Sequence, residues 1–171
     1  AASFQADLTK SAEVQGMVEK VAARFDAIDI LVNNAGDLIA RQPLLSMTEE
    51  FFRSVMDVNL TSAFLVSRAV GPAMVARKSG TIINMSSNSG LYHPSAMRFT
   101  EYVTSKAGLN GMTKALALAL RSVFVFSVYR LALGLLQLVL KAPLHDFQLR
   151  HAQHVAVGVV GVLGAITWRG R

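Results

Sequence analysis

A tyrosine and a lysine four positions apart are the residues of this chain with the clearest capacity for chemistry. Tyr102 and Lys106 fall in a stretch of helical periodicity, so the i, i+4 spacing places both side chains on one face of a helix. An ammonium group beside a phenol favours the phenolate and lowers a tyrosine pKa from its free value of about 10. Such a phenol can donate a proton to a carbonyl under reduction, or accept one from an alcohol. The same pair also occurs on ordinary exposed helices, so the other residues must decide.

Two further polar residues extend this set. Ser87 follows the apolar run that begins at Thr81, and a hydroxyl there can hydrogen-bond a reacting oxygen. Ser86 competes for that role, and a serine that only caps a strand end is the plainer interpretation. Asn59 lies inside a helical pattern, where asparagine is energetically unfavourable. It either serves a site or satisfies a helix carbonyl at a kink.

Small and polar residues follow another apolar run. Ile28 to Val32 is short and rich in β-branched residues, which predicts a buried strand. Asn33-Asn34-Ala35-Gly36 comes directly after it, and the glycine permits a close approach to the backbone. A simple turn after a strand is the alternative interpretation.

Alternating elements must position these residues. The predicted strands end near residue 7 and cover 28–32 and 81–85, and the predicted helices cover 14–25, 49–70 and 101–120. Thr9 or Ser11 is the expected cap of the first helix, and Ser46 has capping-box spacing to Glu49 at the second. Alternation of this kind indicates βαβ units and a parallel sheet, in which ligands bind at the carboxyl ends of the strands.

Composition limits the class of protein. A length of 171 residues suits one domain, and the 52% apolar share is enough for a core. The absence of cysteine excludes disulfides and thiolate–zinc sites and, with no visible secretory signal, predicts a cytoplasmic location. Residues 1–120 hold 11 Lys+Arg against 10 Asp+Glu, whereas residues 121–171 hold 6 against 1. The near-neutral body argues against a nucleic-acid partner.

The last third of the chain has a different character. Ser122 to Leu140 approaches the length that spans a membrane, but Arg130 near its centre costs about 2.5–3.5 kcal/mol on insertion scales, which argues against a membrane helix. A membrane-surface segment, an apolar segment packed on the sheet and a segment without evolved structure are the other interpretations. No carboxylate cluster joins His145, His151 and His154, so no metal site is predicted.

A family resemblance rests on four strings in chain order. They are Asp29-Ile-Leu-Val-Asn-Asn-Ala-Gly36, Asp57-Val-Asn59, Thr81-Ile-Ile-Asn-Met-Ser-Ser87 and Tyr102-Val-Thr-Ser-Lys106. This set resembles the short-chain dehydrogenase/reductase family, and within it the 3-oxoacyl-carrier-protein reductases. The resemblance covers about residues 4–120 and implies hydride transfer between NAD or NADP and a small carbonyl or alcohol substrate. It also implies an α/β fold: a partial Rossmann-type parallel sheet with helices on both faces, lacking the first βαβ unit.

Roles for single residues follow from this resemblance. Tyr102 would be the proton donor or acceptor, Lys106 would favour its ionised form and bind the nicotinamide ribose, and Ser87 would orient the carbonyl. Asn59 would support a proton relay through a water. Ser87 and Tyr102 would contact the substrate. The cofactor-binding residues that the resemblance implies are Asp7, Leu8, Asn34, Ala35, Gly36, Tyr102 and Lys106. Relatives commonly pair through helices that correspond to 49–70 and 101–120, which implies a homo-oligomer.

Three features depart from the family pattern. The Gly-rich turn that cradles a pyrophosphate does not occur in this sequence, and the interval from Ser87 to Tyr102 is longer than the common one. The strand and Pro-Gly turn that the family has after Leu120 are not recognisable. We therefore expect a partial dinucleotide-binding oxidoreductase domain over residues 1–120 and a divergent, apolar, basic tail over 121–171. A catalytically silent member that acts by association with relatives, or with a membrane through its tail, is the alternative function.

Overall fold

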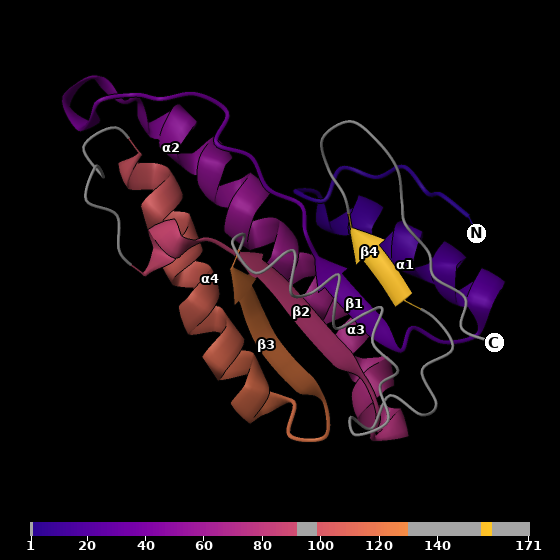
Figure 1. Ribbon diagram of the computed structural model, residues 1–171. Helices are drawn as coiled ribbons and strands as arrows, with labels where there is room; N and C mark the ends of the chain where they lie inside the picture. The colour runs from indigo at the N-terminus through magenta and orange to yellow at the C-terminus, as the bar shows by residue number, and fades with distance from the viewer. Residues whose placement is uncertain (1, 92–98, 130–154, 159–171) are drawn as a thin grey trace.

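The structure is a computed structural model, and it describes residues 2–91, 99–129 and 155–158. These residues form one sheet of parallel strands in the order β3-β2-β1-β4 (Figure 1). The strands are β1 (Ile30–Asn33), β2 (Thr81–Ser86), β3 (Phe124–Tyr129) and β4 (Val155–Gly158). The helices are α1 (Ser11–Phe25), α2 (Glu49–Met56), α3 (Ser62–Arg77) and α4 (Thr100–Ala119). A π-helical turn, η2 (Asp57–Thr61), joins α2 to α3, and short 3-10 turns stand at η1 (Leu44–Ser46) and η3 (Asn88–Gly90).

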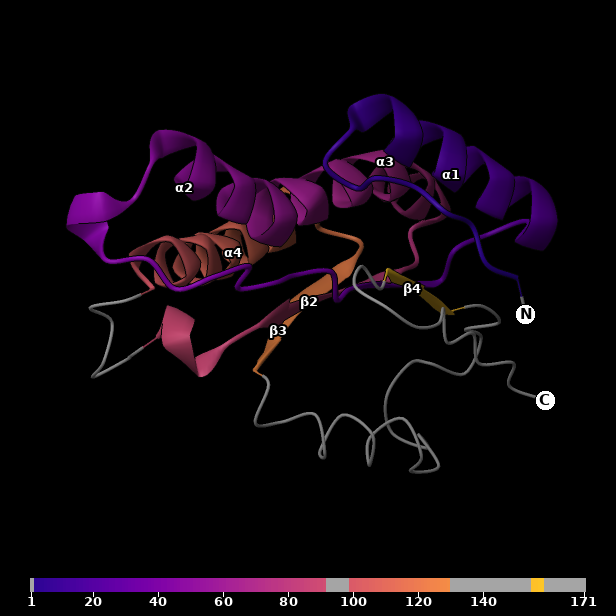
Figure 2. The ribbon, with the colours of Figure 1, turned by 90° about the horizontal axis from the view of Figure 1, so that it is seen from above.

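The layers of the fold confirm the predicted α/β class. Figure 2, which views the sheet nearly edge-on, shows α1, α2, α3 and α4 on the same side of it. Strands that alternate with helices and pair in parallel are the βαβ arrangement that the sequence indicates. The helices of the described residues cover this face of the sheet, which is one of the two faces on which helices are expected.

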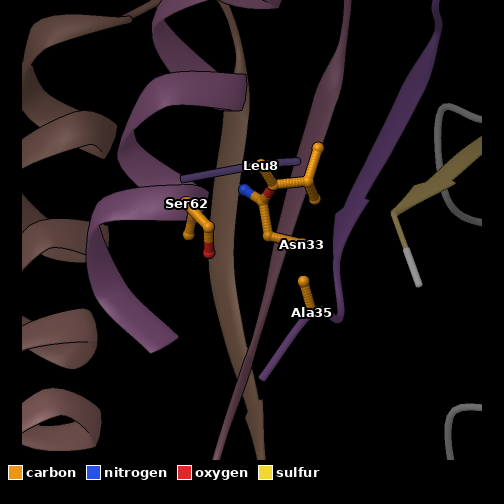
Figure 3. Close-up of a pocket in the computed structure, with 5 residues that line it drawn as sticks. Leu8, Asn33, Ala35 and Ser62 are labelled. Carbon is orange, nitrogen blue, oxygen red and sulfur yellow. The ribbon is translucent and has the colours of Figure 1, made fainter. Parts of the chain in front are cut away.

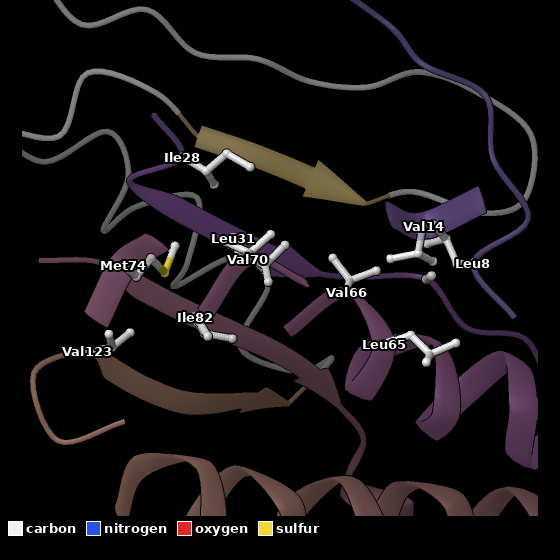
Figure 4. Packing of buried hydrophobic residues seen from close by; sticks show 11 residues of the cluster. Leu8, Val14, Ile28, Leu31, Leu65, Val66, Val70, Met74, Ile82 and Val123 are labelled. Atoms are coloured by element: carbon white, nitrogen blue, oxygen red, sulfur yellow. The ribbon is translucent and has the colours of Figure 1, made fainter. Parts of the chain in front are cut away.

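The hydrophobic core lies between the sheet and α1 and α3. Every residue of β1 is buried, and along β2 only Thr81 is partly exposed. Leu31 and Ile82 pair across the two strands and point into this core, as Figure 4 shows. The largest fully buried side chain is that of Met74 on α3, with 0% exposure. The members of the cluster are Leu8, Val14, Ile28, Leu31, Ala35, Leu65, Val66, Val70, Met74, Ile82 and Val123.

Met74→Ala is therefore expected to lower the free energy of unfolding by about 2–5 kcal/mol, because it removes buried atoms and leaves a cavity in a packed core. Urea unfolding followed by circular dichroism measures this loss. Leu45→Ala is the matched control, because Leu45 is 100% exposed and its truncation should leave stability unchanged. Equal stability of the Met74 variant and the unmodified chain would contradict the core described here.

The ends of the N-terminal elements differ from the sequence predictions. Residues 2–7 form no strand, because the Asp7 carboxylate instead accepts hydrogen bonds from the backbone and hydroxyl of Thr9 in a local turn. Lys10 precedes α1 without a side-chain cap, so the expected caps at Thr9 and Ser11 are wrong. At α2 the cap is Thr48, whose Oγ1 accepts from the Phe51 amide at 3.1 Å, and not Ser46, which lies in η1.

The described residues include two strands beyond residue 120, where the sequence shows no recognisable strand. Phe124–Tyr129 pairs with β2 as β3, and Val155–Gly158 pairs with β1 as β4. A strand therefore does follow Leu120, and the alternating aromatic and β-branched run after Val123 suits a position beside β2. The interpretations of Arg130 and the three tail histidines concern residues outside the described ones.

One helical stretch of the described residues, Glu49–Arg77, is long and apolar enough to cross a membrane by length and composition alone. Half of its most apolar window is buried inside the fold, as is usual for a core helix. The criterion by itself is therefore weak evidence for a membrane span.

Candidate active site

The carboxyl ends of β1 and β2 bring two asparagines together. The parallel register pairs Asn33 with Asn84, and the Asn33 amide donates to Asn84 Oδ1 at 2.8 Å and to Ser67 Oγ at 2.9 Å. The Asn84 amide donates in turn to Thr113 Oγ1 at 2.9 Å, which also accepts from Ser127 Oγ. This polar network joins three strands to α3 and α4 inside the fold. Because buried polar groups are costly without partners, it fixes the sheet and both helices in one register.

A π-helical turn presents Asn59 toward the same end of the sheet. The turn is closed by a bond from the Ser62 amide to the Asp57 carbonyl, one residue longer than in an α-helix. The side-chain amide of Asn59 donates to the Val55 carbonyl at 3.0 Å and to the Asp37 carbonyl at 2.6 Å. Asn59 thus lies in a π-helical turn and satisfies a helix carbonyl, as one of its two interpretations expects. Its Oδ1 is nevertheless buried without a hydrogen-bond partner, so one acceptor remains available.

Lys106 lies with its amine inside this cluster. The side chain is 4% exposed, and Nζ donates to the backbone carbonyl of Met85 at 3.0 Å. The same amine lies 5.7 Å from the ring centre of Tyr102, one helical turn earlier. The i, i+4 prediction is therefore met, since both side chains share a face of α4 that points at the end of β2.

Gly36 completes the cluster by having no side chain. A Cβ built at this position would lie 2.7 Å from Asn59 Oδ1 and 3.2 Å from Lys106 Nζ. The segment after β1 therefore runs directly past both groups. Gly36, Asn59, Lys106 and Tyr102, which come from three separate parts of the sequence, meet at one place.

Burial favours the neutral form of the Lys106 amine. Desolvation lowers the pKa of Lys106 from 10.5 to about 8. Between these two values the unfolded chain binds more protons at Lys106 than the folded chain does, so the free energy of unfolding increases with pH there.

We expect this increase to reach up to about 3 kcal/mol between pH 8 and pH 10.5, since the folded state no longer has to bury an ammonium. Unfolding by urea at a series of pH values measures it. The Lys106→Met variant provides the reference, because the difference between the two curves isolates this one group. Parallel curves for the two proteins over that range would show that the lysine is not desolvated.

The two serines at the end of β2 have different partners. Ser86 Oγ donates to the carbonyl of Lys106 at 3.4 Å, so it contacts the backbone of α4. Ser87 Oγ accepts from the Ser89 amide and donates to Asn88 Oδ1, both at 3.2 Å, within its own turn. These bonds commit Ser86 to helix packing and leave Ser87 as the serine at the sheet end, which is the assignment that the resemblance favours.

A small pocket opens beside the end of β1. Leu8, Asn33, Ala35, Ser62 and Ala63 line it, and Figure 3 shows Leu8 and Asn33 facing Ser62 across it. Two of the expected cofactor contacts, Leu8 and Ala35, are thus brought together.

The remaining expected contacts lie nearby in the chain. Asp7 is exposed and binds Thr9, whose hydrogen bonds lower the pKa of the Asp7 carboxyl. Asn34 is half-buried directly after the strand. Among the described residues no group of three or more His, Cys, Asp or Glu could hold a metal ion.

Sequence reasoning missed several residues of this region. The Met85 carbonyl that binds Lys106 is a backbone group, for which no side chain gives a signal. Asn84 and Thr113 were overlooked, although an asparagine inside an apolar strand is itself a signal that a partner exists.

Comparison with known proteins places this geometry in a family. The family model of the short chain dehydrogenases matches residues 1–141. The chain is 42% identical over 112 residues to 3-oxoacyl-[acyl-carrier-protein] reductase FabG of Thermotoga maritima, covering 65% of this chain and 44% of the relative. It is 40% identical over 131 residues to the 3-oxoacyl-[acyl-carrier-protein] reductase of Synechocystis, with 75% and 51% covered. The chain spans about half the length of the curated relatives that it matches.

Solved structures agree with the sequence matches. A NAD+-bound xylitol dehydrogenase superposes with a TM-score of 0.70 at 32% identity, covering 74% of this chain and 49% of that one. A short-chain type dehydrogenase/reductase from Mycobacterium marinum gives 0.70 at 36% identity, with 74% and 52% covered. The matched model, the relatives and the shared α/β fold together show that this chain belongs to the short-chain dehydrogenase family of oxidoreductases.

Proposed function

We propose that this chain carries the catalytic residues of an oxidoreductase that uses NAD or NADP to interconvert a carbonyl and an alcohol. The observation that carries the proposal is the buried amine of Lys106, which lies beside the Tyr102 ring and within reach of Gly36 and Asn59. Within the described residues Lys106 forms no ion pair with a carboxylate. A desolvated amine of this kind costs stability, which favours a functional reason for it. The relatives named above are reductases and dehydrogenases, which supports the same class of reaction.

Each residue has a part in this mechanism. The Tyr102 hydroxyl donates its proton to the substrate oxygen during reduction and takes one back from an alcohol during oxidation. The Lys106 ammonium, 5.7 Å from the ring, stabilises the negative charge left on the phenol oxygen. Ser87 donates a hydrogen bond to the substrate oxygen and orients it, for which its bond to Asn88 must open. Asn59 Oδ1, the unpartnered acceptor, takes part in returning a proton toward Lys106.

Two groups of residues would contact a nicotinamide dinucleotide. Leu8 and Ala35, with Asp7 and Asn34 beside them, would lie against the adenosine end. Between these residues and Lys106, the missing side chain of Gly36 lets the backbone after β1 run directly against Asn59 and Lys106.

Tyr102 and Lys106 would hold the nicotinamide ribose, and the bound nicotinamide would supply the hydride. The substrate we propose is a small carbonyl or alcohol compound, and 3-oxoacyl thioesters are the first class to test because of the relatives.

Binding of NADH and NADPH to the purified chain, measured by fluorescence or calorimetry, tests this function. We expect micromolar affinity, and we expect Lys106→Met to weaken it. Lys114→Met is the matched control, because Lys114 is exposed on the same helix. A folded chain that binds neither cofactor would instead support the alternative of a catalytically silent member. The chain matches only about half the length of its relatives, which is why this alternative is tested.

Three further expectations stay predictions. They are the division into a domain over 1–120 and a tail over 121–171, a cytoplasmic location, and a homo-oligomer formed through α2, α3 and α4. Phe64 on α3 is 42% exposed, which supports a contact there. Analytical ultracentrifugation of the unmodified chain and of Phe64→Glu tests the oligomer.

A further inference from the structure

Gly90, the last residue of the 3-10 turn η3, holds this turn against the middle of α4. The Gly90 carbonyl accepts a hydrogen bond from the Asn110 side-chain amide at 3.3 Å. The Gly90 amide donates to the Ser87 carbonyl at 3.0 Å, which closes the turn that begins at Ser87. The turn after β2 is therefore tied at one end to the candidate active-site serine and at the other to the helix that carries Tyr102 and Lys106.

Gly90 lies so close to α4 that no side chain fits there. A Cβ at this position would lie 2.7 Å from the Lys106 carbonyl carbon, 2.8 Å from its oxygen and 3.0 Å from the Ala107 nitrogen. These are backbone atoms in the middle of a helix, so no rotamer change can move them away. By contrast, a Cβ at Gly108 would meet only the flexible Leu60 side chain, and one at Gly111 would meet nothing.

The residue touched by Gly90 is also the residue whose amine enters the site. The Lys106 carbonyl additionally accepts from Ser86 Oγ, and Lys106 Nζ donates to the Met85 carbonyl. The backbone of Lys106 is thus seated on η3 while its side chain reaches the end of β2. Any outward shift of α4 at this point moves the amine and opens its surroundings to water.

We propose that Gly90 and Asn110 are positioning residues that set the separation between η3 and α4, and thereby place Lys106 and Tyr102 opposite the ends of β1 and β2. This inference rests on the proposed function in treating these two groups as the reacting machinery. It adds two residues that touch neither cofactor nor substrate, and it explains why the turn after Ser87 must end in a glycine.

The test compares Gly90→Ala with Gly111→Ala, the same substitution at an open position of α4. The first readout is the titration of the Lys106 amine, followed by NMR with labelled lysine and assigned by its loss in Lys106→Arg. Near this amine the described residues place the Met85 carbonyl, the Tyr102 ring and, beside Gly36, the side-chain oxygen of Asn59. In the unmodified chain it should titrate at about 8, and in Gly90→Ala its pKa should rise toward the 10.5 of a solvated lysine.

The second readout is turnover. With the amine and phenol displaced, kcat should fall by about 10- to 100-fold in Gly90→Ala, and KM for the cofactor should rise, because the same two groups would hold the nicotinamide ribose. Gly111→Ala should match the unmodified chain in both readouts. A folded Gly90→Ala protein whose lysine still titrates at about 8 would overturn the proposal.

A second variant covers the case in which Gly90→Ala does not fold. Asn110→Ala keeps the glycine and removes only the bond to its carbonyl, and it should raise the Lys106 pKa by a smaller amount. An unchanged titration in that variant would overturn the proposal. A chain that neither binds NAD(P) nor turns over would refute the proposed function. The lysine titration needs no cofactor, so it would still decide whether Gly90 and Asn110 position Lys106.

Discussion

Tyr102→Phe is expected to lower carbonyl reduction by about 10²- to 10⁴-fold, because it removes the proposed proton donor and leaves the rest of the side chain in place. The ring that faces the Lys106 amine is retained, so the packing of α4 should not change. The assay follows oxidation of the reduced nicotinamide with a panel of carbonyl substrates. Cofactor affinity and thermal stability are measured on the same samples; stability should stay near that of the unmodified chain, and affinity should fall far less than turnover, because the Lys106 contact to the nicotinamide ribose would remain.

The matched control for this substitution is Thr104→Val, two residues further along α4. Thr104 is exposed, and its hydroxyl donates only to the Thr100 carbonyl within the helix, so losing it should leave turnover intact. Full turnover in the Tyr102→Phe protein would remove Tyr102 as the donor. Loss of turnover that is fully accounted for by loss of cofactor binding would leave Tyr102 with the ribose-binding role alone.

The central strands and the faces of the helices could be predicted from local patterns. The apolar run before Asn33 predicts β1 because buried parallel strands are nearly continuous in apolar residues. The spacing of Val14, Met17, Val18 and Val21 predicts the face of α1 that packs on the core. These patterns depend only on residues close together in the sequence, so they predict the elements without knowledge of the fold.

Contacts between distant residues could not be predicted in the same way. The bond between Asn33 and Asn84 exists because the two strands pair in one particular register, and neither strand alone specifies that register. The π-helical turn at Asn59 is equally hidden, since i→i+5 bonding has no sequence pattern distinct from that of an α-helix. Two other signals indicate Asn59: asparagine is unfavourable inside a helix, and the Asp57-Val-Asn59 string belongs to the family resemblance.

Strand β3 shows a limit of apolar runs. In the sequence, Phe124 to Tyr129 is part of a longer apolar segment, and a short run cannot be assigned to strand or helix by hydrophobicity alone. Pairing with β2 decides the matter: Ser127 alternates to the helix side and reaches Thr113, while Phe124 stays largely exposed. Pairing with β2, and not the apolar run itself, determines that these residues form a strand.

Gly36→Ala is expected to lower turnover by about 100-fold and stability by about 1–3 kcal/mol, because its Cβ would lie 2.7 Å from Asn59 Oδ1. Gly36 has no positive φ, so the backbone itself accepts alanine and the effect comes from the contact. Asn59 cannot turn away cheaply, because its amide donates to both the Asp37 and the Val55 carbonyls. Gly16→Ala on α1 is the control, since a Cβ there meets nothing, and it should raise stability by about 0.5–1 kcal/mol.

A double variant separates crowding from a general loss of fold. Gly36→Ala combined with Asn59→Ala removes the group that the new methyl meets, so its stability should exceed the sum expected from the two single variants. Turnover should not recover, since the proposed relay through Asn59 is then missing. Strictly additive unfolding free energies would mean that Gly36 and Asn59 do not touch, and recovered turnover would mean that Asn59 supports the fold and not the proton transfer.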